Sequence, residues 1–294
     1  MNDRRAFLRG LAGAARGGER RDEAGAARGV GRDEAAAAPP DEIAPESPEA
    51  ADSWLERYAR QLVLPEWSEA KQRAVNQASV LVVGAGALGS PVATYLAGAG
   101  VGRLGVVDDG AVELSNLHRQ HLHFTPDVGV PKAHSAVAKL GYLNPEIVIE
   151  PYQARFNPAM LDGQDVVVDC TDSFESRYAI NAACCEAGIP LVEGGVTGMT
   201  GLIMAIRPKH TACYRCAFPE PPPADARPSC AEAGVLGPAA GVVGSLQALE
   251  ALKLLAGLPA LTDAFLQLDL ASLDMLRVTT RRRPDCPDCG DAYA

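Results

Sequence analysis

The chain has 294 residues, of which 47% are hydrophobic, 22% are charged and 5% are aromatic. This composition is typical of an ordinary globular protein. The formal net charge of -10 argues against a basic surface for nucleic acid, and no apolar run reaches the roughly 18 residues of a membrane-spanning helix. Eight cysteines are too sparse for a secreted disulfide scaffold in a chain of this length. We therefore expect a cytoplasmic protein that binds neither nucleic acid nor membranes.

Residues 1–52 differ in composition from the rest of the chain. They are rich in Ala, Gly, Arg and acidic residues and nearly lack Val, Ile, Phe and Tyr. Such a segment buries too little apolar surface to offset its conformational entropy, so we predict a disordered tail. Its start, Arg4-Arg5-Ala6-Phe7-Leu8, resembles a twin-arginine export signal, but the stretch that follows is too rich in glycine and arginine for the hydrophobic region of such a signal. The folded domain is expected to cover residues 53–294.

Helix and strand patterns alternate from Ser53 onward. Ser53 is placed to cap a first helix, and the β-branched runs that follow are typical of buried strands in a parallel sheet. The alternation predicts strands over 80–83, 104–107, 147–149, 166–168 and 190–192, with helices over 91–98, 131–143 and 174–187. This order indicates a doubly wound, Rossmann-like, mostly parallel α/β sheet. After a long helix over 239–255, antiparallel strands are expected near Phe265 and Leu276.

A glycine-rich loop follows the first predicted strand. Gly84, Gly86 and Gly89 form a G-x-G-x-x-G pattern directly after that strand and at the start of a helix. In this context the first glycine permits a tight turn, the second lets a phosphate approach the backbone, and the third allows close helix–strand packing. Asp108 ends the second predicted strand, where a carboxylate accepts hydrogen bonds from ribose hydroxyls. The loop predicts a site for NAD, FAD or ATP, and a glycine turn that serves packing alone is the alternative.

Polar and cationic side chains follow the second strand. Asn116 and Arg119 lie in one polar segment, and Lys132 comes shortly after it. Negative charge builds up on the phosphates when a phosphoanhydride is cleaved, whereas hydride transfer has no need of these cations. Residues 169–172, at the end of another strand, add carboxylates that suit Mg²⁺. The pattern therefore favours ATP with Mg²⁺ over a dinucleotide.

Four cysteines form two Cys-x-x-Cys pairs, Cys213 with Cys216 and Cys286 with Cys289. Four thiolates in this arrangement complete a closed tetrahedral zinc site, which is normally structural. We therefore predict a structural zinc knuckle that ties the C-terminal segment back onto the domain. A labile pair of disulfides is the alternative.

Several motifs, in one order over residues 53–294, resemble those of the adenylating enzymes that activate ubiquitin-like proteins, in particular the bacterial ThiF, MoeB and HesA branch. The motifs are Arg57-Tyr58-Ala59-Arg60-Gln61, the glycine loop, residues 115–120, Lys132, residues 169–172, both Cys-x-x-Cys pairs and Cys230-Ala231-Glu232-Ala233-Gly234-Val235. The resemblance implies an ATP-binding adenylation domain over this whole range.

The resemblance also implies roles for individual residues of the nucleotide site. Asp108 would bind the ribose of ATP, and Asp172 would bind Mg²⁺. Asn116, Arg119 and Lys132 would contact the triphosphate. The family usually has Asn where Ser173 stands here, a change that removes no catalytic group.

Two further roles follow from the resemblance alone. Arg60 corresponds to an N-terminal arginine that reaches the phosphates in the partner subunit's site, which implies a homodimer. Cys230 corresponds to a cysteine that some family members use for a covalent persulfide or thioester intermediate.

The implied activity is ATP-dependent adenylation of a C-terminal carboxylate. The substrate would be a small ubiquitin-like sulfur-carrier protein ending in Gly-Gly, activated as an acyl-adenylate with release of pyrophosphate, in molybdopterin or thiamine biosynthesis. No rhodanese-like domain follows Cys289, so we expect sulfur to come from a separate donor, a cysteine desulfurase or a rhodanese. The alternatives are a non-catalytic nucleotide-binding module of the same fold and an NAD(P)-dependent oxidoreductase.

Overall fold

The structure, a computed structural model, describes residues 48–221 and 234–290. The chain divides into two compact units, one up to Ser68 and the other from Glu69 onward. The predicted tail lies outside the described residues as far as residue 47.

In the first unit, helix α2 (Pro48–Leu62) carries Arg60 in its last turn. Ser53 was expected to cap this helix, but it lies inside α2, which begins at Pro48. The physical reason is that proline is favoured at the first position of a helix, where its missing N–H is not needed. The residues between Pro48 and Ser53 are Glu, Ala, Ala and Asp, and Glu and Ala are strong helix formers.

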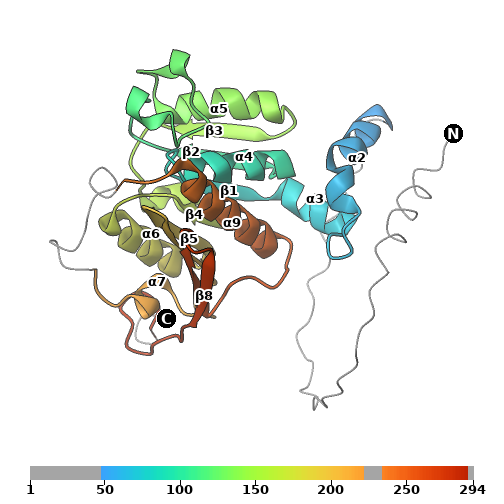
Figure 1. The fold of residues 1–294 in the computed structure, drawn as a ribbon. Helices are drawn as coiled ribbons and strands as arrows, with labels where there is room; N and C mark the ends of the chain where they lie inside the picture. The colour runs from blue at the N-terminus through green and yellow to red at the C-terminus, as the bar shows by residue number, and fades with distance from the viewer. Residues whose placement is uncertain (1–47, 222–233, 291–294) are drawn as a thin grey trace, which may run out of the picture. The chain divides into compact units, whose positions relative to one another are not determined.

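The second unit is built on an eight-stranded sheet in the order β3-β2-β1-β4-β5-β6-β7-β8 (Figure 1). Its strands are β1 (Ser79–Val83), β2 (Arg103–Val107), β3 (Val148–Tyr152), β4 (Val166–Asp169), β5 (Leu191–Thr197), β6 (Thr200–Ile206), β7 (Ala264–Asp269) and β8 (Asp274–Thr279). The pairs from β3 to β5 along the sheet are parallel, and the pairs from β5 to β8 are antiparallel. This confirms the predicted doubly wound sheet with C-terminal antiparallel strands. The strand order reverses between β1 and β4, and ligands of such folds bind at that switch point.

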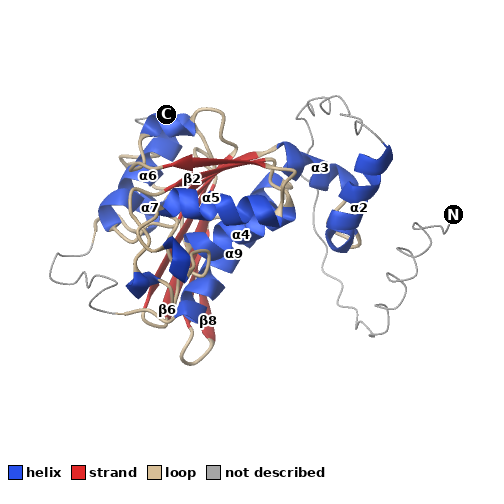
Figure 2. Cartoon of the chain, turned by 90° about the horizontal axis from the view of Figure 1, so that it is seen from above, coloured by secondary structure: helices blue, strands red, loops and turns tan. Residues whose placement is uncertain are grey.

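Helices lie on both faces of this sheet (Figure 2). They are α3 (Glu69–Gln77), α4 (Gly89–Ala99), α5 (Lys132–Leu143), α6 (Phe174–Ala187), α7 (Tyr214–Ala217) and α9 (Gly237–Leu255), with short 3₁₀ turns η1 (Leu114–Asn116), η2 (Thr125–Asp127) and η3 (Pro158–Leu161). Two adjacent glycines of β5 leave room for side chains from the helices on the two faces of the sheet. Gly194 faces Gln247 of α9, and Gly195 faces Arg177 of α6. Among the described residues, no helix combines the length and apolarity needed to cross a bilayer.

Two strand boundaries and one helix differ from the prediction for identifiable reasons. The strand expected at 147–149 is β3, Val148–Tyr152, which includes Pro151; an edge strand tolerates proline because it pairs on one side only. Strand β5 extends to Thr197 rather than ending at residue 192, through glycines that do not resemble strand residues. Helix α3 was not predicted, because its buried residues are Val75 and the polar Gln72.

Candidate nucleotide site and cysteine cluster

A cavity of about 1140 Å³ opens at the switch point, at the C-terminal ends of β1, β2, β4 and β5. Six of the residues predicted for the nucleotide site line it: Gly84, Gly86, Asp108, Arg119, Lys132 and Asp172. Gly89 and Asn116 are buried beside it rather than in its wall. Arg60 belongs to the first unit, and Cys230 lies outside the described residues.

The glycine loop needs glycine at two positions for its own packing. Gly84 has a φ of 100°, in the left-handed region, and a Cβ there would lie 2.8 Å from the carbonyl oxygen of Cys170. A Cβ on Gly89 would clash with the carbonyl of Gly84. At Gly86 the nearest atom is 3.6 Å away, on the side chain of Gln120, which is an ordinary contact. The fold itself does not require glycine at Gly86, so its missing side chain is best explained by room for a ligand.

Asp108 fastens the glycine loop to the end of β2. Its Oδ2 accepts a hydrogen bond from the backbone N–H of Ala85 at 2.8 Å, and its Oδ1 accepts one from Gly110 at 2.8 Å. The Nζ of Lys132 lies next to the same turn, 3.5 Å from the point that a Cβ on Gly110 would occupy. Each carboxylate oxygen has a second lone pair, so Asp108 retains acceptors for a ligand hydroxyl.

The segment after β2 folds into turns that present Arg119 to the cavity. The guanidinium of Arg119 donates to the backbone carbonyl of Ser115 at 2.8 Å. Asn116 is 6% exposed, and its Oδ1 accepts from the N–H of Glu113 at 3.3 Å. Asn116 therefore stabilises the turn that carries Arg119. Gln120 also lines the cavity, and its buried Oε1 has no hydrogen-bond partner within the described residues.

His123 also supports the nucleotide site, although the sequence did not predict a role for it there. Its ring is buried between the glycine loop and α5, with Nε2 2.8 Å from the Ala85 carbonyl and Nδ1 2.9 Å from Ser135 Oγ. Burial lowers the pKa of His123, so the neutral ring is favoured. A neutral ring that donates to Ala85 accepts from the Ser135 hydroxyl. Asp108 and His123 thus both hold Ala85 in the glycine loop, Asp108 through its backbone N–H and His123 through its carbonyl oxygen.

Asp172 lies just beyond β4, at the start of α6. Its side chain is exposed and lines the cavity. Ser173 follows as the N-cap of α6, and its hydroxyl oxygen accepts from the N–H of Ser176 at 3.1 Å. Serine and asparagine are both strong N-cap residues, so Ser173 fills the structural role of the Asn usual at this position.

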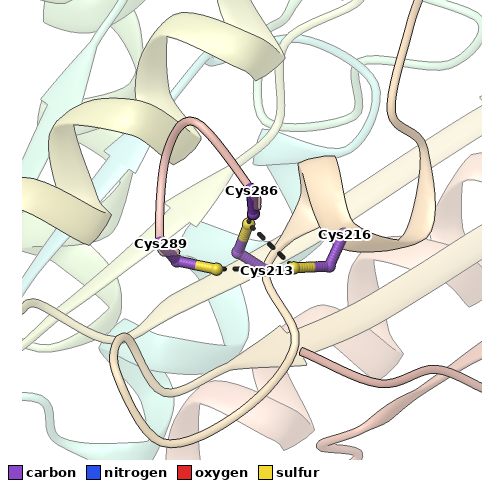
Figure 3. Close-up of side chains that lie close together, drawn as sticks. All are labelled: Cys213, Cys216, Cys286 and Cys289. Carbon is purple, nitrogen blue, oxygen red and sulfur yellow. Dashed lines mark hydrogen bonds between the residues drawn. The ribbon is translucent and has the colours of Figure 1, made fainter. Parts of the chain in front are cut away.

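The four predicted cysteines come together in one buried cluster (Figure 3). Cys213 Sγ lies 3.8 Å from Cys216 Sγ and 3.6 Å from Cys286 Sγ, and Cys216 Sγ lies 3.4 Å from Cys289 Sγ. Four sulfurs at about 2.3 Å from a tetrahedral ion are about 3.8 Å apart, whereas a disulfide requires about 2.05 Å. The observed spacings therefore fit a metal site made by four thiolates rather than a pair of disulfides.

Neighbouring residues hold the two Cys-x-x-Cys pairs against each other. The Asn181 side chain of α6 accepts from the N–H of Tyr214 at 2.9 Å and donates to Asp288 at 2.7 Å, so it joins one pair to the other. The N–H of Arg283 points to Cys216 Sγ at 3.3 Å, a contact that favours thiolate. Tyr214 and Phe218, beside the first pair, also line the nucleotide cavity. The cluster therefore supports one wall of the cavity.

Comparisons with known proteins agree on one family. Residues 58–288 match the ThiF family. A sulfur carrier protein adenylyltransferase from Thermus thermophilus is 46% identical over 247 residues, which cover 81% of this chain and 91% of that protein. The SAMP-activating enzyme E1 of Haloferax volcanii is 44% identical over 242 residues, with 81% and 89% covered.

A longer relative and a solved structure extend the comparison. The adenylyltransferase and sulfurtransferase MOCS3 of Sus scrofa is 47% identical over 257 residues, and the matched region spans 85% of this chain and only 56% of that protein. The crystal structure of E. coli MccB with MccA-N7isoASN has a TM-score of 0.70 at 21% identity, with 81% of this chain and 75% of that chain covered. At that identity, the likeness shows the fold alone.

Proposed function

The chain belongs to the ThiF family, and we propose that it is an ATP-dependent adenylyltransferase for a small ubiquitin-like sulfur-carrier protein. The enzyme would activate the carrier's C-terminal glycine carboxylate for sulfur transfer in molybdopterin or thiamine biosynthesis. One observation carries the proposal: a single cavity gathers the glycine loop, the cations Arg119 and Lys132, and the exposed carboxylate of Asp172. The relatives named as sulfur carrier protein adenylyltransferase and MOCS3 support the same substrate class.

The proposed reaction needs no proton transfer. A C-terminal carboxylate is already ionised near neutral pH, and one of its oxygens attacks the α-phosphorus of ATP. A new oxygen–phosphorus bond forms as the bond to the β-phosphate oxygen breaks, which gives an acyl-adenylate and pyrophosphate. Arg119 and Lys132, which line the cavity, would offset the charge that develops on the leaving pyrophosphate. Gly86 would let the phosphates approach the backbone, and Asp108 would accept from the ribose.

Asp172 would hold Mg²⁺ together with the phosphates. Mg²⁺ keeps several waters and binds through one or two carboxylates plus substrate phosphates, and a single exposed carboxylate at the cavity edge suits that donor set. The ion would supply neutralising charge to the triphosphate.

Three parts of the proposal concern other proteins and residues beyond the cavity. A separate cysteine desulfurase or rhodanese would supply sulfur. The thiolate of Cys230 would attack the carbonyl carbon of the acyl-adenylate and form a thioester as the bond to AMP breaks. Arg60 would complete the site of a second copy of the chain in a homodimer. The roles of Arg60 and Cys230 rest on the family motifs rather than on contacts of the described residues.

ATP–pyrophosphate exchange tests the activity. Labelled pyrophosphate should enter ATP only when the enzyme, Mg²⁺ and a carrier protein ending in Gly-Gly are all present, because exchange requires reversible adenylate formation. The same carrier without its last glycine serves as the control and should support little exchange. Binding of ATP without exchange, with every carrier of the same genome, would instead indicate a non-catalytic module. Oxidation or reduction of a nicotinamide cofactor would point to an oxidoreductase.

Zinc is the metal that we propose for the cysteine cluster, since four thiolates in a closed tetrahedral site are typical of structural zinc. Freshly prepared protein should contain one zinc per chain. Replacing Cys286 and Cys289 together by serine should remove the metal and lower the unfolding temperature by at least about 10 °C, because structural zinc contributes folding energy and about 1 kcal/mol shifts Tm by 2–4 °C in a domain of this size. Cys184→Ser, which alters a buried thiol outside the cluster, should keep its zinc. Well under one zinc per wild-type chain would contradict this assignment.

A further inference from the structure

Two buried carboxyl groups lie side by side beneath the nucleotide cavity. Asp169, the last residue of β4, is in register with Glu193 of the neighbouring parallel strand β5. Both side chains are fully buried, at 0% exposure. Asp169 Oδ2 and both carboxyl oxygens of Glu193 have no hydrogen-bond partner that the described part of the chain supplies. Buried carboxylate oxygens that lack a hydrogen-bond donor are costly, so the pair requires an explanation.

Arg177 of α6 connects this pair to the cavity. Its Nη1 lies 3.3 Å from Glu193 Oε1, and its Nη2 donates to the backbone carbonyl of Thr171 at 3.1 Å. Gly195 of β5 makes room for the guanidinium, since any Cβ at that position would clash with Arg177 Nη1. The absence of a side chain at Gly195 is thus a requirement of the contact. Thr171 directly precedes Asp172, the exposed carboxylate of the proposed Mg²⁺ site.

The charges of this cluster balance only if one carboxyl group keeps its proton. Two ionised carboxylates and one guanidinium would leave a net negative charge without access to water. Asp169 and Glu193 are register partners on neighbouring parallel strands, and two carboxylates placed side by side have no hydrogen to share. Burial, followed by the charge of Asp169, raises the pKa of Glu193 well above its usual range, and Arg177 opposes that shift.

The other titratable groups that face the cluster add no compensating charge. Burial raises the pKa of the Cys170 thiol, directly after β4, and of the Cys184 thiol on α6. Burial likewise raises the pKa of the Tyr214 hydroxyl on α7. All three are therefore neutral near neutral pH, and Arg177 is the cation that faces Glu193.

We propose that Glu193 is a positioning residue for the adenylation site: as a neutral acid it donates a hydrogen bond to Asp169, which leaves Arg177 to hold the Thr171 carbonyl next to Asp172. The single proton supplies Asp169 Oδ2 with the donor that it lacks. The inference rests on the proposed function for its effect on the reaction, but the protonation of Glu193 can be tested without any activity.

The first test is the pH dependence of stability in Glu193→Gln. A glutamine amide donates to Asp169 and accepts from Arg177 as the neutral acid does, but it cannot ionise. The folded-state pKa of Glu193 is raised, so its contribution to stability is complete below the unfolded-state pKa of about 4.3 and is lost as the pH rises toward the folded-state pKa. In urea unfolding, Glu193→Gln should therefore become more stable relative to wild type by up to about tenfold in the equilibrium constant per pH unit above pH 4.5. Glu186→Gln, which alters an exposed acid on α6, should show no such trend.

A second pair of variants tests whether the proton is shared. Asp169→Asn should weaken the pH trend without removing it, because the second negative charge beside Glu193 is gone while burial still opposes its ionisation. The double variant Asp169→Asn/Glu193→Gln leaves Arg177 without a counter-charge, so it should be less stable than either single variant at pH 8. A stability difference between wild type and Glu193→Gln that is constant from pH 5 to pH 8 would overturn the proposal, as would additive effects in the double variant.

The pH profile of ATP–pyrophosphate exchange tests the link to the site. The alkaline limb of the profile should move to higher pH in Glu193→Gln, because its amide keeps Arg177 and Thr171 in place after the wild-type pair has lost its proton. Glu186→Gln should leave that limb where it is in wild type. An unmoved limb in Glu193→Gln would refute the positioning role even if the stability data support a neutral Glu193. Failure of exchange in wild type would count against the proposed function and leave the stability test intact.

Discussion

Lys132→Ala is expected to lower the rate of ATP–pyrophosphate exchange by about a hundredfold to a thousandfold and to leave the fold intact. Removing one preorganised group that faces developing charge typically costs about 3–4 kcal/mol of transition-state stabilisation. The Nζ of Lys132 lies at the turn around Gly110, at the edge of the cavity, so its loss empties no packed core. Arg119→Ala should act in the same way, because Arg119 is only half-buried and its guanidinium is held by the backbone of Ser115.

The matched controls are cations of the same type outside the cavity. Lys209→Ala alters an exposed lysine beyond β6, and Arg73→Ala alters an arginine that pairs with Glu69 on α3. Both controls should keep near wild-type exchange and the same unfolding temperature as the site variants. A Lys132→Ala or Arg119→Ala enzyme with near-normal exchange would exclude that residue from the transition-state site.

Local pattern predicted the parts of the site that belong to the backbone framework. The apolar strand before Gly84, the glycine spacing and the acid after β2 are all short-range features, and the observed loop has the tight turn and close packing that they imply. Each of these depends on a few consecutive residues and a known fold. The two Cys-x-x-Cys pairs were similarly informative, because the metal chemistry of four thiolates limits how they can be arranged.

Features that depend on register and tertiary packing were not predictable in this way. Glu193 and Gly195 look like turn residues, yet both lie within β5, where register places Glu193 beside Asp169. His123 has no motif around it, and only the folded chain brings its ring between Ala85 and α5. A buried polar group is specified by its distant partners, so a single sequence does not reveal it.

An Arg60→Ala protein and an Asp172→Asn protein should each be inactive alone, and mixing them should restore activity. In the proposed homodimer each site takes Arg60 from one chain and Asp172 from the other. A mixed dimer then contains one complete site, formed by the Arg60 of the Asp172→Asn chain and the Asp172 of the Arg60→Ala chain. If subunits exchange at random, about half of the dimers are mixed, and activity should approach about a quarter of wild type per total site.

Two controls make this result specific to a shared site. Mixing Arg60→Ala with the double variant Arg60→Ala/Asp172→Asn should restore nothing, because neither chain can supply Arg60. Differently tagged chains that are captured together show that mixed dimers have formed. If mixed dimers are present and exchange stays absent, Arg60 acts within its own chain, since every site then lacks one of the two groups. Arg60 lies in the last turn of α2, in a unit separate from the one that carries Asp172, so only the recovery of activity distinguishes the two arrangements.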